Sequence, residues 1–255
     1  MKTITERHQF ILQRLKESGS VTIQELSDRM EVSGVTIRKD LKLLEDKSLL
    51  FRTRGGGSIT NPYAFEKPID EKALIHAEEK QKIAKTALSL IGQHDSIIIS
   101  SGTTVFELAR SLHPAGKLTV ITPAVKVAAE LSNRANVEVM QLGGLIRPNS
   151  SSVVGSYAEQ MLDQLSCGLL FVGVDGIDFD FGLSISNLTE TSLNQKMIDA
   201  AQTVAVLADC SKFGKRGIGK IGNLDQIHYL ITDSGVSAET VRKLEERGVK
   251  VMVAG

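Results

Sequence analysis

The stretch from Val21 to Lys47, VTIQELSDRMEVSGVTIRKDLKLLEDK, predicts two helices joined by a tight turn. Thr22 and Glu25 match the T-x-x-E capping box, in which each side chain satisfies a backbone amide at a helix start. Ser33 is a second N-cap signal after the turn. Apolar residues recur at helical spacing in both segments, namely Ile23, Leu26 and Met30, then Ile37, Leu41 and Leu44. We therefore expect a helical pair that buries one face.

The exposed side of the second predicted helix is short, polar and basic. Winding the sequence at about 100° per residue places Val35, Lys39 and Lys42 opposite the apolar stripe. Thr36 and Arg38 then lie on its shoulders. Such a face can be an ordinary solvated cationic surface. It can also be a recognition helix whose first residues reach base edges in the major groove.

The sequence that follows favours the recognition helix. Residues 49–59, LLFRTRGGGSI, alternate as a strand with Arg52 and Arg54 on one face, turn at three glycines and return. A basic hairpin after a helix-turn-helix is a wing that can lie along DNA phosphates. We therefore interpret residues 1–60 as a winged helix-turn-helix domain that binds double-stranded DNA. The predicted DNA contacts are Ser33, Val35, Thr36, Arg38, Lys39, Lys42, Arg52 and Arg54.

The motifs V-T-I-Q-E-L, V-S-G-V-T-I-R-K-D-L-K-L-L-E and F-R-T-R-G-G-G resemble the N-terminal domain of the DeoR family. Members of that family are bacterial repressors of sugar-utilisation operons. The resemblance implies that this chain is a transcriptional repressor whose head binds an operator.

The composition fits a chain with a basic head and an acidic body. The 255 residues, 42% of them hydrophobic, suffice for two domains with buried cores. The 30 basic and 30 acidic residues balance, which argues against a nucleic-acid coat protein. Residues 1–60 nevertheless hold 11 Lys and Arg against 8 Asp and Glu, so the head is net +3 and the remainder net −3. This asymmetry suits docking of one face on DNA.

Several classes of protein are disfavoured by the sequence. It shows neither a signal-peptide pattern nor an apolar run of about 18 residues, so we expect a cytoplasmic protein without a membrane span. Cys167 and Cys210 are too few and too isolated for a disulfide framework or a zinc site, and the five histidines share no ligand spacing. We therefore expect no metal and no cofactor.

A second domain is predicted over residues 71–255, after a linker at 60–70 that carries Pro62 and Pro68. A long helix is expected at 71–91, followed by strands that alternate with helices. The candidate strands are residues 96–100, 118–122, 137–142, 169–174, 204–208, 229–232 and 249–253. The candidate helices are residues 105–112, 124–131, 157–165, 193–201 and 238–247. This alternation predicts an α/β domain with a doubly wound, mostly parallel sheet.

The ligand site of such a sheet lies beyond the carboxyl ends of its strands. The first strand is followed by Ser100-Ser101-Gly102-Thr103-Thr104 and a helix, whose N-terminal amides can hold an anion. Because a strand-to-helix turn needs small residues in any case, this motif alone is weak evidence.

Charged residues follow other strands of the predicted sheet. Arg147 and Lys212 can each meet a phosphate, whereas Asp175 and Asp209 can accept hydrogen bonds from sugar hydroxyls. Each could equally be a capping carboxylate or a surface cation, but their shared edge favours a site. The predicted effector-binding residues are Ser100, Gly102, Thr103, Thr104, Arg147, Asp175, Gly176, Asp209 and Lys212.

The segments E-E-K-Q-K-I-A-K, S-G-T-T, L-G-G-L-I-R, G-V-D-G-I-D and A-D-C-S-K-F-G resemble the sensing domain of the DeoR family. That domain is similar to sugar-phosphate isomerases of the ribose-5-phosphate type. The resemblance implies that a phosphorylated sugar is the effector. It implies further that Gly102, Thr103 and Thr104 hold the phosphate, while Asp175 and Gly176 border the sugar. A palindromic operator in turn requires a homo-oligomer, either a dimer or a tetramer.

An alternative function is an active sugar-phosphate isomerase with a fused head. An isomerase needs a positioned general base and a group that stabilises the enediolate. Asp175 and Lys212 match those two roles only approximately. A ligand-binding domain needs only groups that bind the phosphate and groups that accept hydrogen bonds from the hydroxyls. A dehydrogenase is disfavoured because no G-x-G-x-x-G directly follows a predicted strand. We therefore expect a regulator and not an enzyme.

Overall fold

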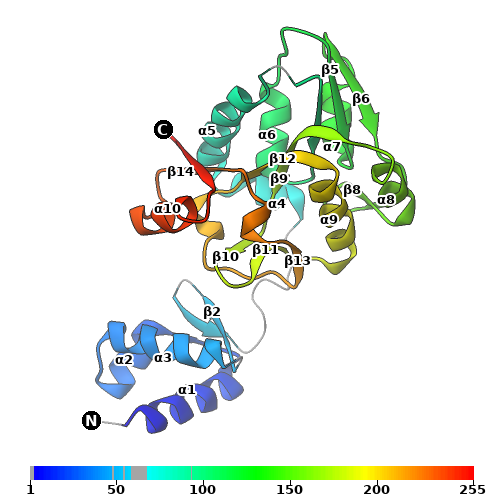
Figure 1. Cartoon of the computed structure of the whole chain (residues 1–255). Helices are drawn as coiled ribbons and strands as arrows, with labels where there is room; N and C mark the ends of the chain where they lie inside the picture. The colour runs from blue at the N-terminus through cyan, green and yellow to red at the C-terminus, as the bar shows by residue number, and fades with distance from the viewer. Residues whose placement is uncertain (1–2, 48, 54, 59–67, 93) are drawn as a thin grey trace. The chain divides into compact units, whose positions relative to one another are not determined.

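The computed structural model describes residues 3–47, 49–53, 55–58, 68–92 and 94–255. The chain divides into two compact units, residues 1–65 and 66–255 (Figure 1). The predicted wing residue Arg54 and most of the predicted linker, including Pro62, lie outside the described residues.

The N-terminal unit combines helices with a small antiparallel sheet. Its helices are α1 (Ile4–Ser18), α2 (Ile23–Met30) and α3 (Gly34–Asp46), and its strands are β1 (Ser20–Thr22), β2 (Phe51–Thr53) and β3 (Gly56–Ser58). The strand order is β1-β3-β2, so the predicted wing is extended by a strand that the sequence did not predict. An added Cβ on Gly56 would lie 1.8 Å from the Val21 carbonyl oxygen, which explains why a glycine stands where β3 meets β1.

The helix starts and the core of this unit follow the predicted pattern. The Thr22 hydroxyl accepts a hydrogen bond from the Glu25 amide at 3.1 Å, and the Ser33 hydroxyl accepts one from the Thr36 amide at 3.2 Å. The buried core consists of Ile11, Leu15, Val21, Leu26, Met30, Ile37, Leu41, Leu44 and Leu50. The two apolar stripes read from the sequence therefore close on one core.

The C-terminal unit is built on a parallel sheet that contains all the predicted strands. These are β4 (Ser96–Ile99), β5 (Leu118–Thr122), β6 (Val137–Gln141), β9 (Cys167–Gly173), β12 (Ala201–Leu207), β14 (Tyr229–Asp233) and β15 (Lys250–Ala254). The order β15-β14-β12-β9-β4-β5-β6 means that the chain builds outward from β4 to one edge, returns beside β4 at β9, and continues to the other edge. This is the doubly wound arrangement that the sequence predicts.

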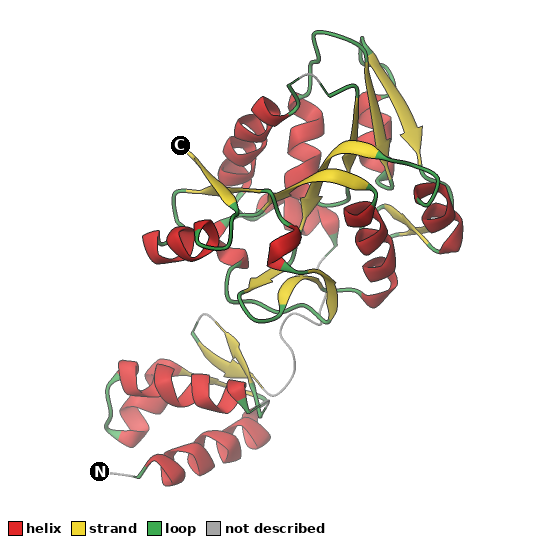
Figure 2. Ribbon diagram, in the orientation of Figure 1, coloured by secondary structure: helices red, strands yellow, loops and turns green. Residues whose placement is uncertain are grey.

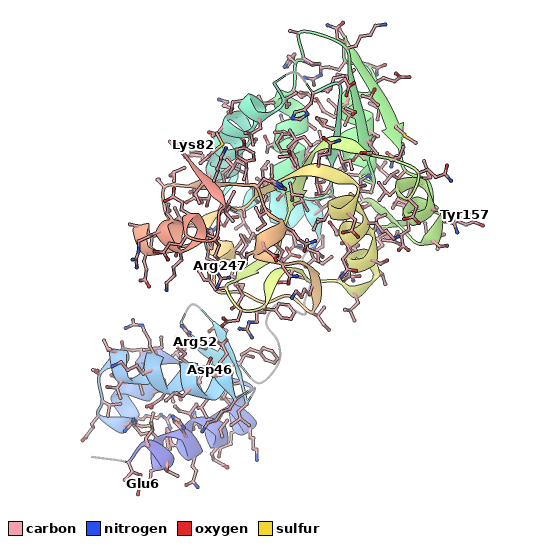
Figure 3. The ribbon with its side chains drawn as sticks, viewed as in Figure 1. Glu6, Asp46, Arg52, Lys82, Tyr157 and Arg247 are labelled. Atoms are coloured by element: carbon pink, nitrogen blue, oxygen red, sulfur yellow. The ribbon has the colours of Figure 1, made fainter. Side chains whose placement is uncertain are left out.

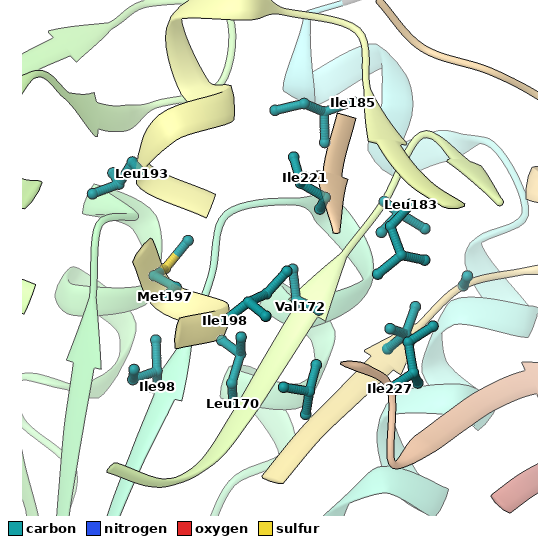
Figure 4. Close-up of a cluster of buried hydrophobic side chains, with 14 of the residues drawn as sticks. Ile98, Leu170, Val172, Leu183, Ile185, Leu193, Met197, Ile198, Ile221 and Ile227 are labelled. Atoms are coloured by element: carbon teal, nitrogen blue, oxygen red, sulfur yellow. The ribbon is translucent and has the colours of Figure 1, made fainter. Parts of the chain in front are cut away.

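Helices cover both faces of this sheet (Figure 2). They are α5 (Ala77–Ala87), α6 (Thr103–Ser111), α7 (Val125–Leu131), α8 (Ser156–Leu162), α9 (Thr191–Asp199) and α10 (Ala238–Glu245). Successive strand residues alternate between faces, so Ile97 packs in one core cluster and Ile98 in the other. Figure 4 shows the second cluster, where Leu170 and Val172 of β9 lie near Met197 of α9.

Several short elements were not predicted from the sequence. They are the hairpin β7 (Leu145–Arg147) with β8 (Ser152–Val154), the small sheet of β10 (Gly176–Asp178), β11 (Gly182–Ile185) and β13 (Gly219–Gly222), and the 3-10 turns η1 (Leu88–Leu90), η2 (Leu188–Glu190), η3 (Cys210–Lys212) and η4 (Leu224–Gln226). Their strands have only three or four residues, too few for a periodic pattern to be recognised.

The prediction of one long helix over residues 71–91 was wrong. The segment breaks into α4 (Ile69–Leu74) and α5, separated by Ile75 and by His76 at φ +54°. Leu74, the last residue of α4, is 83% exposed. The buried Lys80 of α5 donates hydrogen bonds to the carbonyls of Lys72 and Ile75, so its ammonium caps the end of α4 and stabilises the break.

Candidate functional site

The first candidate surface is the outer face of α3. Val35 is 59% exposed, and Arg38, Lys39 and Lys42 are also exposed, whereas Ile37 is fully buried beneath them. Thr36 is half-buried at the first turn, and its hydroxyl lies 3.0 Å from that of Ser33. The predicted side chains thus gather on one solvent-facing side of the helix.

The inner side of α3 is held by a charge that the sequence analysis did not identify. Asp40 is 2% exposed and accepts hydrogen bonds from Nε and Nη2 of Arg7 on α1, at 2.6 and 3.0 Å. This two-pronged pair fixes the orientation of α3 against α1. The sequence does contain a sign of this buried charge, because Asp40 lies between Ile37 and Leu41 on the apolar side of the predicted helix.

The wing residue Arg52 is partly engaged by Glu45 at the end of α3. Its amide donates to Oε1 of Glu45 at 3.0 Å, and its Nη1 lies 3.6 Å from Oε2 of the same residue. Both side chains are about two-fifths exposed, at 40% and 38%. A surface ion pair of this kind contributes roughly 0–1 kcal/mol, so a phosphate can replace Glu45 at little cost.

The second candidate site is a cavity at the carboxyl ends of the parallel strands. It lies where the strand order reverses, because Ser101 to Thr104 follow β4, and Val174 and Asp175 follow β9. Its volume is about 110 Å³. One water needs roughly 10–15 Å³, so the cavity has room for a small organic molecule. The lining residues are Ile69, Lys72, Ile75, His76, Lys80, Ser101, Gly102, Thr103, Thr104, Asn149, Ser150, Gly173, Val174, Asp175, Ile185, Glu190, Asn194, Asp209, Ser211 and Lys212.

The turn after β4 presents a helix start to this cavity. Gly102 is the N-cap of α6 at φ +130°, a conformation that side chains rarely adopt, and it makes no side-chain cap. The first amides of a helix have no partner within the helix and carry its positive end. Thr103 and Thr104 therefore bring amides and hydroxyls to one wall of the cavity.

Three lysines converge on the same cavity. The ammonium of Lys72 lies 3.1 Å from Oδ1 of Asp175, and Lys80 gives two of its three protons to backbone carbonyls. The ammonium of Lys212 makes no hydrogen bond or ion pair with any other residue that the structure describes. Burial, followed by the charges of Lys212 and Lys72, lowers the pKa of Lys80. Three carboxylates, those of Asp175, Glu190 and Asp209, also line the cavity, and of the three lysines only Lys72 lies within ion-pair distance of a carboxylate in the described part of the chain.

The carboxylates of the site are held in place by local contacts. Oδ2 of Asp175 accepts the Ser186 amide at 2.9 Å. Burial alone would raise the pKa of Asp175, but Lys72, Lys212 and the Ser186 hydrogen bonds outweigh it, and the pKa lies below its usual value. Asp209 is 2% exposed and accepts the Ser211 amide at 3.0 Å.

Three predicted effector residues lie outside the cavity lining. Ser100 is fully buried, and its hydroxyl accepts the Gly173 amide at 3.1 Å, so it joins β4 to β9. The guanidinium of Arg147 lies 2.9 Å from Oε1 of Glu190, which does line the cavity. An added Cβ on Gly176 would lie 2.3 Å from the Lys215 carbonyl oxygen, so this glycine permits close packing. These residues contact or pack behind the residues that line the cavity and do not line it themselves.

The remaining predicted residues, Gly102, Thr103, Thr104, Asp175, Asp209 and Lys212, do line the cavity. The sequence analysis missed the wall formed by α4 and the start of α5, and it missed Glu190 and Asn194 at the start of α9. Lys80 could have been noticed, since it occupies the apolar helical phase of Ile83, Ala84 and Ala87. The α4 wall depends on the break at His76, and residues 73–78, ALIHAE, contain no glycine or proline that would mark a turn.

Metal sites, reactive thiols and membrane-spanning helices are the other features that would bear on function. In that part of the chain no group of three or more His, Cys, Asp or Glu side chains is arranged to hold a metal ion. Cys167 is buried in β9, where burial raises the pKa of its thiol. No helix among the described residues has both the length and the apolar character that crossing a bilayer requires.

Comparison with known proteins gives matches over nearly the whole chain. Residues 7–62 match the model of the DeoR-like helix-turn-helix domain, and residues 75–234 match that of the DeoR C terminal sensor domain. The "Putative aga operon transcriptional repressor" of Escherichia coli O157:H7 is 36% identical over 98% of this chain and 94% of its own length. The HTH-type transcriptional repressor GlcR of Bacillus subtilis (strain 168) is 32% identical over 97% and 95%. Both relatives are named as transcriptional repressors.

Among solved structures, ribose 5-phosphate isomerase A of Methanocaldococcus jannaschii superposes with a TM-score of 0.41 and 17% identity. The superposition covers 54% of this chain and 55% of that one.

Proposed function

The chain belongs to the DeoR family of transcriptional regulators, and we propose that it is a repressor of a carbohydrate operon, released or engaged by a phosphorylated sugar in the cavity beyond β4 and β9. The observation that carries the proposal is the convergence of three lysines and the start of α6 on one small cavity. The names of relatives, such as the aga operon repressor and the repressor GlcR, support the assignment to carbohydrate control.

The phosphate is proposed to lie between the start of α6 and the lysines. A phosphate dianion offers several acceptor oxygens at once, which suits the amides and hydroxyls of Thr103 and Thr104. The Lys212 ammonium makes no ion pair among the described residues, and the Lys80 ammonium retains one proton beyond its two carbonyl contacts. Both ammonium groups would therefore gain a charge-assisted hydrogen bond from the ligand.

The sugar is proposed to lie toward the carboxylates. One oxygen of each carboxylate accepts a backbone amide, from Ser186 in Asp175 and from Ser211 in Asp209. The other oxygen accepts no backbone amide among the described residues, and in Asp175 it accepts the Lys72 ammonium. Asn194 is buried at the start of α9, where its amide nitrogen donates to the Glu190 carbonyl and its amide oxygen can accept from a hydroxyl. A polyol with a phosphate at one end matches this division of charge.

The head is proposed to bind DNA through α3 and the wing. Thr36 and Val35 at the first turn are placed to contact base edges, while Arg38, Lys39 and Lys42 are placed to contact phosphates. Two heads are needed to occupy a palindromic operator, so the proposed working form is a homodimer or tetramer in the cytoplasm.

The decisive experiment measures thermal stability of the full-length protein with sugar phosphates and with the matching unphosphorylated sugars. A ligand that binds only the folded state at 100 times its Kd stabilises it by about 2.7 kcal/mol. We expect stabilisation by a phosphorylated sugar alone, together with a change in operator affinity at the same concentration. Equal stabilisation by an unphosphorylated sugar would contradict the phosphate site.

A further inference from the structure

The short helix α4 forms one wall of the cavity beyond β4 and β9, and apolar burial contributes little to holding it there. Ile69 and Lys72 of α4 and its C-cap residue Ile75 line the cavity, and the helix is drawn in cyan in Figure 1. No residue of α4 is buried, and Leu74 at its end is largely exposed. Few buried apolar contacts mark the segments of a protein that open at the lowest free-energy cost. The position of α4 therefore depends on its polar contacts.

Most of the polar contacts that hold α4 are made by residues that line the cavity. The Lys72 ammonium lies 3.1 Å from Oδ1 of Asp175 on the opposite wall. The buried ammonium of Lys80 donates hydrogen bonds to the carbonyls of Lys72 and Ile75 at the end of the helix. The groups that position α4 are thus the same groups that are proposed to meet the ligand.

The charges around Lys80 favour an anion between α4 and the rest of the cavity. Burial, followed by the charges of Lys212 and Lys72, lowers the pKa of Lys80, and the opposing charge of Asp209 does not cancel this effect. An anion close to these ammonium groups favours their charged forms. Because Lys80 has a third proton beyond its two carbonyl contacts, it can meet an anion without releasing the end of α4.

We propose that α4 is a strap that a phosphate group bound in the cavity tightens onto the sensor domain. The Lys72 ammonium then bridges the phosphate and Asp175, and the Lys80 ammonium bridges the phosphate and the end of α4. Because α4 is the first helix after the predicted linker, the tightened strap fixes the place at which the chain enters this domain. The inference rests on the proposed function for one feature only, the phosphate group of the ligand.

The test is amide hydrogen exchange of the full-length protein, with inorganic phosphate as the probe and sodium chloride at equal ionic strength as the control. A ligand that binds only the closed strap shifts the opening equilibrium by a factor of 1 + [L]/Kd, about 100-fold at 100 times Kd. We expect phosphate near saturation to slow exchange of the amides of residues 72–75, which lie in and just after α4, roughly tenfold or more. Exchange in α10 of the same domain, which does not line the cavity, should stay unchanged.

Two variants separate tightening by the ligand from ordinary anchoring of the helix. Lys72→Met removes the ion pair with Asp175, and Asp70→Asn removes the ion pair with Lys126, but neither Asp70 nor Lys126 lines the cavity. Both variants should exchange faster in α4 without phosphate. At one phosphate concentration, Asp70→Asn should keep the protection factor that phosphate adds in the wild type. Lys72→Met should lose roughly tenfold of it, because a hydrogen bond to a charged group is lost.

Two outcomes would overturn the proposal. One is exchange in α4 that phosphate slows no more than chloride does, and the other is an equal loss of the phosphate effect in Asp70→Asn and Lys72→Met. The failure of the strap is distinguishable from the failure of the proposed function. If phosphate protects α4 but no sugar phosphate changes operator affinity, the strap stands and the proposed function fails. If a sugar phosphate changes operator affinity while exchange in α4 stays the same, the proposed function stands and the strap fails.

Discussion

The outer face of α3 and the cavity beyond β4 and β9 both present cationic side chains, but they hold these charges in opposite ways. Arg38, Lys39 and Lys42 are exposed on a helix surface. Lys80 is 4% exposed, and two backbone carbonyls fix its ammonium. An exposed cation is screened by salt and moves freely, whereas a buried one is poorly screened and already oriented. The first arrangement suits a long polyanion, and the second suits one small anion.

The two sites also differ in which of their charged side chains are fixed by other residues. The head surface is anchored from behind by the Arg7–Asp40 pair, while its outward cations lie at the surface. In the cavity, the lysines themselves are held by Asp175 and by the end of α4. The arrangement of these lysines in the cavity therefore depends on the position of α4, the first helix after the predicted linker.

The largest expected difference between the two sites is their response to salt. If a dimer makes about 6–10 phosphate contacts, operator affinity should fall roughly 10³- to 10⁵-fold between 50 and 200 mM salt. Sugar-phosphate affinity should fall far less, because buried charges are screened less. Fluorescence anisotropy with operator DNA and calorimetry with the ligand measure the two slopes. Equal slopes would mean that the cavity is not a sheltered anion site.

The next largest effect is expected from Lys212→Met, which removes a cavity cation that has no other described partner. Loss of a hydrogen bond to a charged group costs about 1.5–3 kcal/mol, which is roughly 10- to 150-fold in ligand affinity. Operator affinity without ligand should stay near the wild-type value. The control is Lys82→Met, because Lys82 is exposed on α5, the helix that carries the buried Lys80 (Figure 3). A matching loss of ligand affinity in the control would point to a general charge effect.

The smallest effects are expected from single changes on the head. Lys42→Ala should weaken binding to all DNA sequences alike and reduce the salt slope by about 1. Thr36→Val keeps the volume but removes a hydroxyl, so it should change the preference among operator sequences. Competition binding against operator variants and unrelated DNA measures both. If Lys42→Ala altered sequence preference as much as Thr36→Val, the division between phosphate and base contacts would be wrong.

The sequence by itself determined the elements that repeat a period. The stripes of α2 and α3, the N-caps at Thr22 and Ser33, and the seven β-rich segments were all legible, because burial of one face imposes a pattern on neighbouring residues. The turn after β4 was also legible, since a strand-to-helix turn favours small residues. These features depend on contacts within a short stretch of chain.

Only the tertiary structure decided which polar residues meet. Lys72 and Lys80 lie on either side of the break at His76, whereas Lys212 is more than 130 residues further along the chain. The three converge because that break folds α4 across the ends of β4 and β9. Arg147 followed a strand like the other candidates, yet the hairpin turns it to Glu190, a residue more than forty positions away. A local sequence pattern indicates which face of a helix or strand is buried. It does not indicate which distant side chain packs against that face. That distant partner determines whether a charged residue is free to meet a ligand or is paired within the cavity wall.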